Sequence, residues 1–285
     1  MFTLRRLSGG TLALTREHQE IARPRVTEIA WGDFDANAYS SDQLDGAAEL
    51  WSTRAVQEMS SLALFTELCG KLQAFGAPLD WSGAFARMIA DEVRHTDLCM
   101  RLCEVLGRPA NPEIDPRALQ LLGGAPTRAT LRHMVVSLFC IGETISGRMF
   151  RQALRHTTVP LARDVVSAIV TDETFHAELG WELGALLMRN DGPAFEAERA
   201  SLAAALPELF RHYARLCSAT RSPSAVASDA WSDPGPNFGT LSAAGYARCF
   251  FDGMREDVVP GLVSIGLPEA QPAFAELLSA LGEAG

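Results

Sequence analysis

The sequence has no surplus of positive charge and no long apolar run. Its 285 residues carry 25 Lys and Arg against 35 Asp and Glu, which gives a formal net charge of −10 at pH 7. Because no basic block is present to neutralise phosphates, we expect neither a nucleic acid nor an anionic membrane surface as a partner. No stretch reaches the length of a membrane span, and the first residues lack the apolar core of a signal peptide. We therefore expect a cytoplasmic protein that makes no membrane contact.

Cysteine and tyrosine are also scarce. The six cysteines form no C-x-x-C pair, so neither a rubredoxin-like module nor a zinc ribbon is expected. Reduced, buried thiols are the simplest expectation for a cytoplasmic protein. The three tyrosines are Tyr39, Tyr213 and Tyr246.

Helical periodicity and the placement of Gly and Pro predict an all-α protein. We expect an irregular N-terminal arm over residues 1–43, with a short strand or turn around Gly9 and Gly10. A helical bundle is expected over 44–190, and additional helices over 191–285 with a long loop at 221–240. The four bundle helices are expected at about 45–75, 82–107, 127–156 and 160–190, with Ser82 capping the second and a long crossover between the second and third. The later helices are expected near 193–219, 241–256 and 268–282.

The same short motif occurs twice. Residues 91–95 read DEVRH and residues 172–176 read DETFH. On a helix, positions i and i+3 share one face, so each copy directs a carboxylate and an imidazole the same way. Six histidines would give roughly 0.02 D-E-x-x-H matches by chance in this composition. Two copies therefore indicate a shared function for the two helices.

Both copies lie in apolar stripes. Glu92 and His95 continue the helical spacing of Phe85, Met88, Cys99, Leu102 and Leu106, and Glu173 and His176 continue that of Val166, Ile169, Gly180 and Leu183. Buried carboxylates and imidazoles cost several kcal/mol unless they are paired or bound to metal. The pattern therefore predicts a metal site.

The other two bundle helices each offer further carboxylates. Glu143 is the single interior acid of the third helix, and the small residues Gly142, Ser146 and Gly147 around it leave room for either a cavity or a close helix contact. The first helix offers Glu58 or Glu67. Glu58 shares a stripe with Trp51 and Phe65, whereas Glu67 is spaced to pair with Lys71 on the surface. We favour Glu58 and keep Glu67 as the alternative.

One Glu from each of two helices and a Glu-x-x-His from each of two others is the ligand set of di-iron carboxylate bundles. On these residues the chain resembles the ferritin-like superfamily over about residues 45–190. The DEVRH motif is most similar to the bacterial multicomponent monooxygenase hydroxylases and to the small subunit of ribonucleotide reductase. The resemblance implies a ferritin-like four-helix bundle holding two metal ions, one on Glu58, Glu92 and His95 and the other on Glu143, Glu173 and His176.

The resemblance also implies roles for neighbouring residues. Asp91 would bond to His176 and Asp172 to His95, which would fix the tautomer of each imidazole, and Arg94 would support them. Three positions depart from the relatives. Cys99 stands where reductase subunits carry a radical tyrosine, Phe175 where hydroxylases have Arg, and Ile169 where some ferritin-like N-oxygenases have a further His ligand.

The resemblance implies an enzyme, a non-haem di-iron oxidoreductase that uses dioxygen to oxidise a small organic substrate. Two iron ions are the expected cofactor, with a manganese/iron pair as the alternative. The expected partners are dioxygen, the small-molecule substrate and an external electron donor, and a homodimer is compatible with the sequence. The alternative function is a ferritin- or rubrerythrin-like protein that handles iron through ferroxidase activity or scavenges peroxide.

Overall fold

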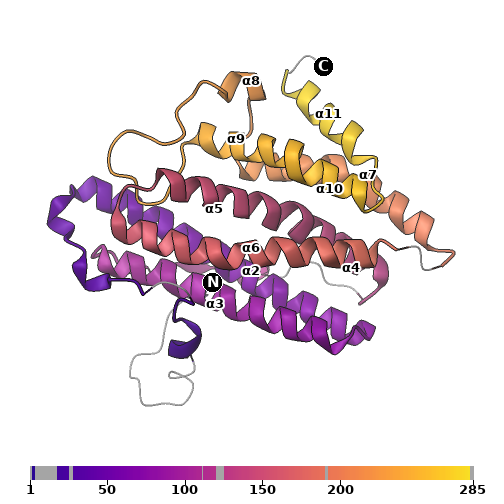
Figure 1. Cartoon of the computed structure of the whole chain (residues 1–285), viewed down its shortest axis with the longest axis horizontal. Helices are drawn as coiled ribbons and strands as arrows, with labels where there is room; N and C mark the ends of the chain where they lie inside the picture. The colour runs from indigo at the N-terminus through magenta and orange to yellow at the C-terminus, as the bar shows by residue number, and fades with distance from the viewer. Residues whose placement is uncertain are drawn as a thin grey trace. The chain divides into compact units, whose positions relative to one another are not determined.

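The computed structural model of the chain describes residues 2–3, 18–25, 28–110, 112–119, 125–189 and 192–282. Helices make up almost all of the regular structure in these ranges, which confirms the all-α prediction (Figure 1). The turn expected around Gly9 and Gly10 lies outside the described residues. Within the same ranges, every helix is too short or too polar to cross a membrane.

The chain forms two compact units. Unit 1 comprises Met1–Pro126 and Thr158–Ile169, and unit 2 comprises Thr127–Thr157 and Val170–Gly285. Helix α6 (Pro160–Leu187) contributes to both units, because its first ten residues belong to unit 1 and the rest to unit 2.

Unit 1 is built on two long helices that pack against each other, α2 (Ser41–Phe75) and α3 (Leu79–Val105). Helix α2 begins earlier than expected because Ser40 and Gln43 form a capping box, each side chain bonding the other's backbone N–H. It ends at Gly76, whose φ of 85° is the left-handed conformation that glycine adopts most easily.

Helix α3 begins at Leu79, so the prediction that Ser82 caps it is wrong. Pro78 is the residue before its first turn. Proline has a fixed φ and no N–H to satisfy, so it can precede a helix without a polar cap. Residues 79–81, which were expected to precede the helix, therefore form its first turn.

Short elements complete unit 1. The strand β1 (Phe2–Thr3) pairs antiparallel with β2 (Glu113–Ile114). The 3-10 turns are η1 (Trp31–Asp33), η2 (Ala36–Ala38) and η3 (Pro116–Leu119). Most of the expected N-terminal arm and crossover thus has little regular structure in the described residues.

Unit 2 begins with an uninterrupted helical run made of three segments. These are α4 (Arg128–Met134), the π-helix η4 (Val135–Glu143) and α5 (Thr144–His156). The side chain of Thr127 accepts a hydrogen bond from the backbone N–H of Thr130 and so caps the start. The run agrees with the helix expected over 127–156, but the π-helix in its middle was not predicted.

The C-terminal part of unit 2 adds further helices: α7 (Phe195–Leu216), α8 (Pro223–Val226), α9 (Ala243–Gly253), the π-helix η5 (Met254–Val258), α10 (Val259–Ser264) and α11 (Ala270–Ala280). The helix expected to stop near residue 256 instead continues through η5 into α10, in whose first turn Pro260 lies.

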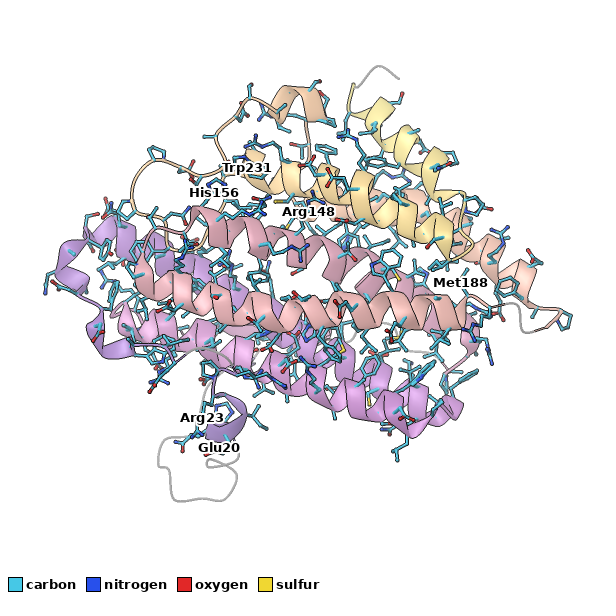
Figure 2. The ribbon with its side chains drawn as sticks, in the orientation of Figure 1. Glu20, Arg23, Arg148, His156, Met188 and Trp231 are labelled. Atoms are coloured by element: carbon cyan, nitrogen blue, oxygen red, sulfur yellow. The ribbon has the colours of Figure 1, made fainter. Side chains whose placement is uncertain are left out.

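Side-chain contacts connect these C-terminal helices to one another and to α5. Phe210 of α7 meets Phe274 of α11 edge to face, with ring centroids 6.5 Å apart. Arg148 of α5 donates to Asp257 of η5 at 2.7 Å. The long loop after α7 places Trp231 against His156 at the end of α5, with stacked rings 5.7 Å apart (Figure 2).

Two glycines let α6 approach the π-helix closely. A Cβ on Gly180 would lie 2.4 Å from Cβ of Phe139, and one on Gly184 would lie 2.8 Å from Sγ of Cys140. Neither glycine has a positive φ. Their role is therefore to leave space for the neighbouring helix.

Replacing Gly180 with Ala should destabilise the protein by about 1 to 3 kcal/mol, because the added methyl overpacks the contact with Phe139. The matched control is Gly70→Ala in α2, where an added Cβ meets nothing within 4 Å. There, Ala should be neutral or stabilising by up to about 1 kcal/mol. Chemical unfolding of both variants measures the difference, and equal free energies of unfolding would contradict the close approach.

Candidate metal centre

Unit 1 brings Glu58, Glu92 and His95 together. Glu58 comes from α2, and Glu92 and His95 come from adjacent turns of α3. His95 Nδ1 lies 3.5 Å from Glu58 Oε2 and 4.0 Å from Glu92 Oε2. All three side chains are buried, and His95 has no exposed surface. We refer to these three residues as half-site 1.

Unit 2 brings Glu143, Glu173 and His176 together in the same way. Glu143 is the last residue of η4, and Glu173 and His176 lie on adjacent turns of α6. His176 Nδ1 lies 3.6 Å from Glu143 Oε2 and 3.8 Å from Glu173 Oε1. These side chains are also buried. We refer to them as half-site 2.

The spacing of the donor atoms fits a shared ion in each half-site. One oxygen or nitrogen from each of the three residues lies within 4.8 Å of the other two, in both half-sites. Two ligand atoms that each lie about 2.1 Å from one ion are about 3 to 4 Å apart. The four histidine–carboxylate distances fall in that range and exceed the usual hydrogen-bond length of about 3 Å. The protein therefore contains a buried cluster of Glu and His side chains that can bind metal.

Charge also favours a cation. Each half-site buries two carboxylates against a single imidazole, and buried carboxylates need a nearby positive charge. Burial raises the pKa of Glu58, but His95, Glu92 and Arg54 together lower it by more, so the pKa lies below its usual value. Glu58 is consequently an ionised ligand candidate.

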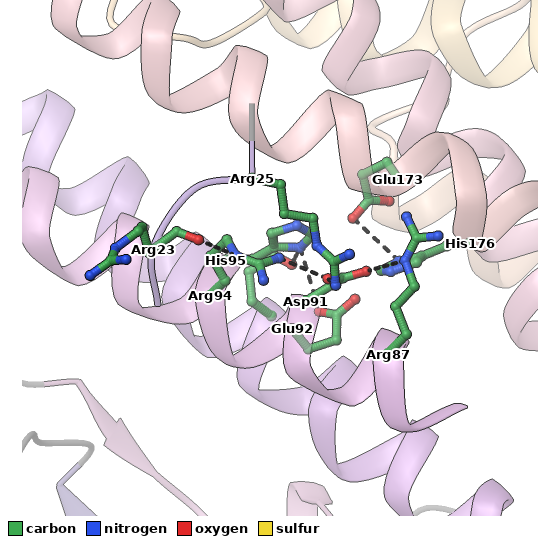
Figure 3. A network of polar contacts seen from close by, with 10 residues as sticks. Arg23, Arg25, Arg87, Asp91, Glu92, Arg94, His95, Glu173 and His176 are labelled. Carbon is green, nitrogen blue, oxygen red and sulfur yellow. Dashed lines mark hydrogen bonds and ion pairs between the residues drawn. The ribbon is translucent and has the colours of Figure 1, made fainter. Parts of the chain in front are cut away.

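Asp91 lies at the centre of an arginine cluster in unit 1. Arg25 and Arg94 both donate to Asp91 Oδ1 at 2.7 Å, and Arg87 Nε lies 3.6 Å from Asp91 Oδ2 (Figure 3). The Asp91 side chain has no exposed surface. A fully buried carboxylate with two charge-assisted hydrogen bonds is held in one orientation. Because Asp91 precedes Glu92, the cluster also restrains the half-site.

The N-terminal arm contributes to this cluster. Arg25 reaches Asp91 from the arm, and the backbone carbonyl of Arg23 accepts from Arg94 Nε at 2.9 Å. A third contact joins His18 Nε2 to Asp97 Oδ1 at 3.2 Å. Residues 18–25 are therefore attached to α3 directly beside half-site 1. Neither Arg25 nor Arg87 was predicted from the sequence, since no motif links either residue to DEVRH.

The other residues singled out in the sequence are placed as follows. Asp172 is buried next to Glu173, and Arg94 is buried on Asp91. Glu67 pairs with Lys71 at 3.3 Å, while Glu58 lies beside His95, so the two candidates of the first helix occupy different faces. Phe175 contacts the ring of His176 edge to face.

Cys99 is buried one turn after His95. Burial raises the pKa of the Cys99 thiol well above its usual value, and the charge of Glu58 adds to this shift. The thiol is therefore protonated and is a poor metal ligand or nucleophile.

Tyr213 lies beside half-site 2, although no sequence pattern indicated it. Its hydroxyl donates to the carbonyl oxygen of Ser137 in η4 at 2.8 Å. Burial and, to a smaller extent, the charge of Glu143 raise the pKa of Tyr213 above its usual range. The phenol therefore keeps its proton and can donate it in a hydrogen bond.

Removing Arg94 should destabilise unit 1, because Arg94→Ala deletes a buried hydrogen bond to a charged group. We expect a loss of about 1.5 to 3 kcal/mol in the free energy of unfolding. Arg23→Ala is the matched control, since it deletes only an exposed ion pair with Glu20 and retains the backbone carbonyl that Arg94 contacts (Figure 2). The control should lose less than about 1 kcal/mol. Equal losses, measured by denaturant unfolding, would contradict the restraining role of the cluster.

Comparison with protein-family models, curated proteins and solved structures finds no match for this chain. The residues of the two half-sites are therefore the basis on which its function is inferred.

Proposed function

We propose that the two half-sites form one dinuclear metal centre in a ferritin-like four-helix bundle. The four helices would be α2, α3, the α4–η4–α5 run and α6. The bound metals would be two iron ions, with a manganese/iron pair as the alternative. The protein would be an oxygen-activating oxygenase or oxidase that acts on a small organic substrate.

The observation that carries this proposal is the repetition of one geometry in both units. Each half-site has two glutamates and one histidine, and in each the Nδ1 atom is the imidazole nitrogen that lies 3.5–4.0 Å from the carboxylates. In each, one Glu and the His come from a D-E-x-x-H motif and the second Glu from another helix. Unrelated ion pairs would have no reason to repeat residue type, spacing and burial together.

A dinuclear centre accounts for an incomplete ligand count. Three side chains do not fill the four to six positions that iron and manganese usually take, so each half-site alone leaves its ion under-coordinated. Glutamates can bind through both oxygens or bridge two ions, and four glutamates shared by two divalent ions would balance their charge. Two half-sites acting together would fill the coordination positions and balance the charge of the ions better than either half-site would alone.

The donor set favours iron or manganese. Four carboxylates and two imidazoles make an oxygen-rich site with nitrogen ligands, and no cysteine is among the six residues. Zinc and copper sites in proteins rely more on imidazole and thiolate. A reducible ion also suits a site that leaves positions open for another ligand.

Two iron ions, when bound, would supply the reduction of dioxygen, with an external electron donor returning them to the ferrous state. The chain's own residues would hold and orient them. Asp91, fixed by Arg25 and Arg94, would orient His176, and Asp172 would orient His95. With Cys99 in place of a radical tyrosine, oxidation of a bound substrate is a better fit than long-lived radical storage.

Metal binding should depend on Glu58 and not on Glu67. Glu58→Gln removes a charged ligand and should weaken binding of one ion by more than about 100-fold, beyond the loss typical of outer-shell groups. Glu67→Gln breaks only the pair with Lys71 and should leave both affinities unchanged. Anaerobic Fe(II) titration with a competing chelator measures both variants. If Glu67→Gln lost metal binding and Glu58→Gln did not, Glu67 would be the ligand in place of Glu58.

Oxygen chemistry is tested by loading the protein with Fe(II) without oxygen and then adding an oxygen pulse. We expect two irons per chain, an oxygen-dependent absorbance change in stopped flow, and a magnetically coupled iron pair in Mössbauer spectra. Size-exclusion chromatography on the same sample tests the ferritin-like alternative. A monomer or dimer with two irons supports the oxygenase, whereas a large shell carrying many irons, or uncoupled iron, would overturn it.

A further inference from the structure

The π-helix η4 determines where Glu143 lies. In a π-helix the backbone N–H bonds to the carbonyl five residues back, and the N–H of Thr144 indeed reaches the carbonyl of Phe139. Each residue of an α-helix turns the chain by about 100°, so an added residue in one turn rotates every later side chain by that angle. If Val135–Glu143 became α-helical, Glu143 would turn away from His176. The three side chains of half-site 2 can therefore come together only if η4 keeps its wide π turn.

Tyr213 of α7 contacts this wide turn directly. Its hydroxyl donates to the carbonyl of Ser137, in the first half of η4, at 2.8 Å. In an α-helix that carbonyl would accept from the amide of residue 141, and in a π-helix it accepts from residue 142. The phenol gives the carbonyl a second donor, which favours the arrangement in which the carbonyl is turned towards α7.

Gly142 makes the approach of Tyr213 possible. A Cβ at position 142 would lie 2.8 Å from the Tyr213 hydroxyl, closer than side chains tolerate. Glycine inside a helix is unfavourable, so a packing reason is expected for it. Here the reason is space for the tyrosine, directly before the candidate ligand Glu143. Of the two interpretations of the small residues around Glu143, close helix contact holds at Gly142.

Helix α7 is fixed to the same helical run at a second place. Arg132 of α4 is fully buried, donates to the carbonyl of Leu187 at 2.8 Å, and forms an ion pair with Glu198 in the first turn of α7. Tyr213 lies near the other end of α7. Helix α7 thus has a polar contact with the α4–η4 segment towards each of its ends, which limits how far Tyr213 can move.

We propose that Tyr213 and Gly142 are positioning residues for the metal centre. Tyr213 holds the π turn through the carbonyl of Ser137, Gly142 admits the phenol, and together they place Glu143 next to His176 and Glu173. This inference rests on the proposed function, because it assigns the C-terminal helix α7 a part in metal binding. It concerns only half-site 2 and leaves half-site 1 unaffected.

The test uses three variants of the full-length protein: Tyr213→Phe, Gly142→Ala and the double variant. Co(II) is the probe, titrated anaerobically and followed by its ligand-field absorption. Tyr213→Phe should weaken the binding of one Co(II) by about 10- to 100-fold and leave the other unchanged. Gly142→Ala should weaken the same ion at least as much. The double variant should be no worse than Tyr213→Phe, because the clash requires the hydroxyl.

The control is Tyr246→Phe in α9, where the Tyr246 hydroxyl lies 3.5 Å from Oγ1 of Thr240 in the preceding loop. It should bind both Co(II) ions as the wild type does. Thermal unfolding of the metal-free proteins separates positioning from general stability, since a merely structural tyrosine would lower the midpoint and weaken both ions alike. Unchanged Co(II) affinity in Tyr213→Phe, or damage in Gly142→Ala that persists in the double variant, would overturn the proposal.

Hydrogen exchange of the metal-free protein distinguishes this failure from failure of the proposed function. Tyr213→Phe should speed exchange of the amides of residues 137–143 relative to the wild type, while Tyr246→Phe should not. If the wild type binds no Co(II), the proposed function fails, and faster exchange still supports the contact. If exchange is unchanged, the contact does not hold the π turn, and the inference fails whether or not metal binds.

Discussion

The structure depends on the burial of paired carboxylates beside single imidazoles. Glu92, Glu173, His95 and His176 are all at most 3% exposed, so water cannot offset their charge. Ionised groups removed from water are stable only with opposite charge and with hydrogen bonds that satisfy their remaining atoms. The apolar stripes around them supply neither. This constraint makes a cation the simplest explanation for the half-sites, and it accounts for the polar groups that surround them.

The support for half-site 1 comes from outside its two helices. Asp91 is also fully buried, and it accepts hydrogen bonds from Arg25 and Arg94 at one carboxylate oxygen. Arg25 and the carbonyl of Arg23 belong to the N-terminal arm, so the arm is part of the structure that holds α3 in place. Beside half-site 2, the contact from outside the long helices comes from α7, where Tyr213 donates to the carbonyl of Ser137. Segments outside the four long helices thus reach both half-sites.

The sequence was sufficient to predict which side chains are buried where apolar residues recur with helical periodicity. The stripes of α3 and α6 placed Glu92, His95, Glu173 and His176 in the interior, and the choice between Glu58 and Glu67 followed from the faces they share with Trp51 and Lys71. Helix starts were less predictable. Helix α2 begins at the capping box of Ser40 and Gln43, and α3 begins directly after Pro78, although Ser82 is a common capping residue. Arg25 could not be predicted, since the arm has no period and its contact with Asp91 spans 66 residues.

The π-helix could not be predicted from the sequence for a related reason. Its sequence, VVSLFCIGE, is apolar at nearly every position, so it carries no periodic signal that could separate 3.6 residues per turn from a wider turn. Tyr213, a residue distant in sequence, contacts this turn from another helix. Gly142 was noticed as a small residue beside Glu143, but the sequence left a cavity and a close contact equally open.

The glycines of unit 2 suggest where a substrate would not enter. Gly142, Gly180 and Gly184 each face a bulky neighbour, respectively the Tyr213 hydroxyl, the Phe139 side chain and the Cys140 sulfur. Small residues near a metal site are often taken as space for a ligand, yet here that space is filled by the protein's own side chains. The Tyr213 hydroxyl of α7 fills the space beside Gly142, the residue directly before Glu143. Under the proposed function, these three glycines therefore do not provide the space for dioxygen or substrate.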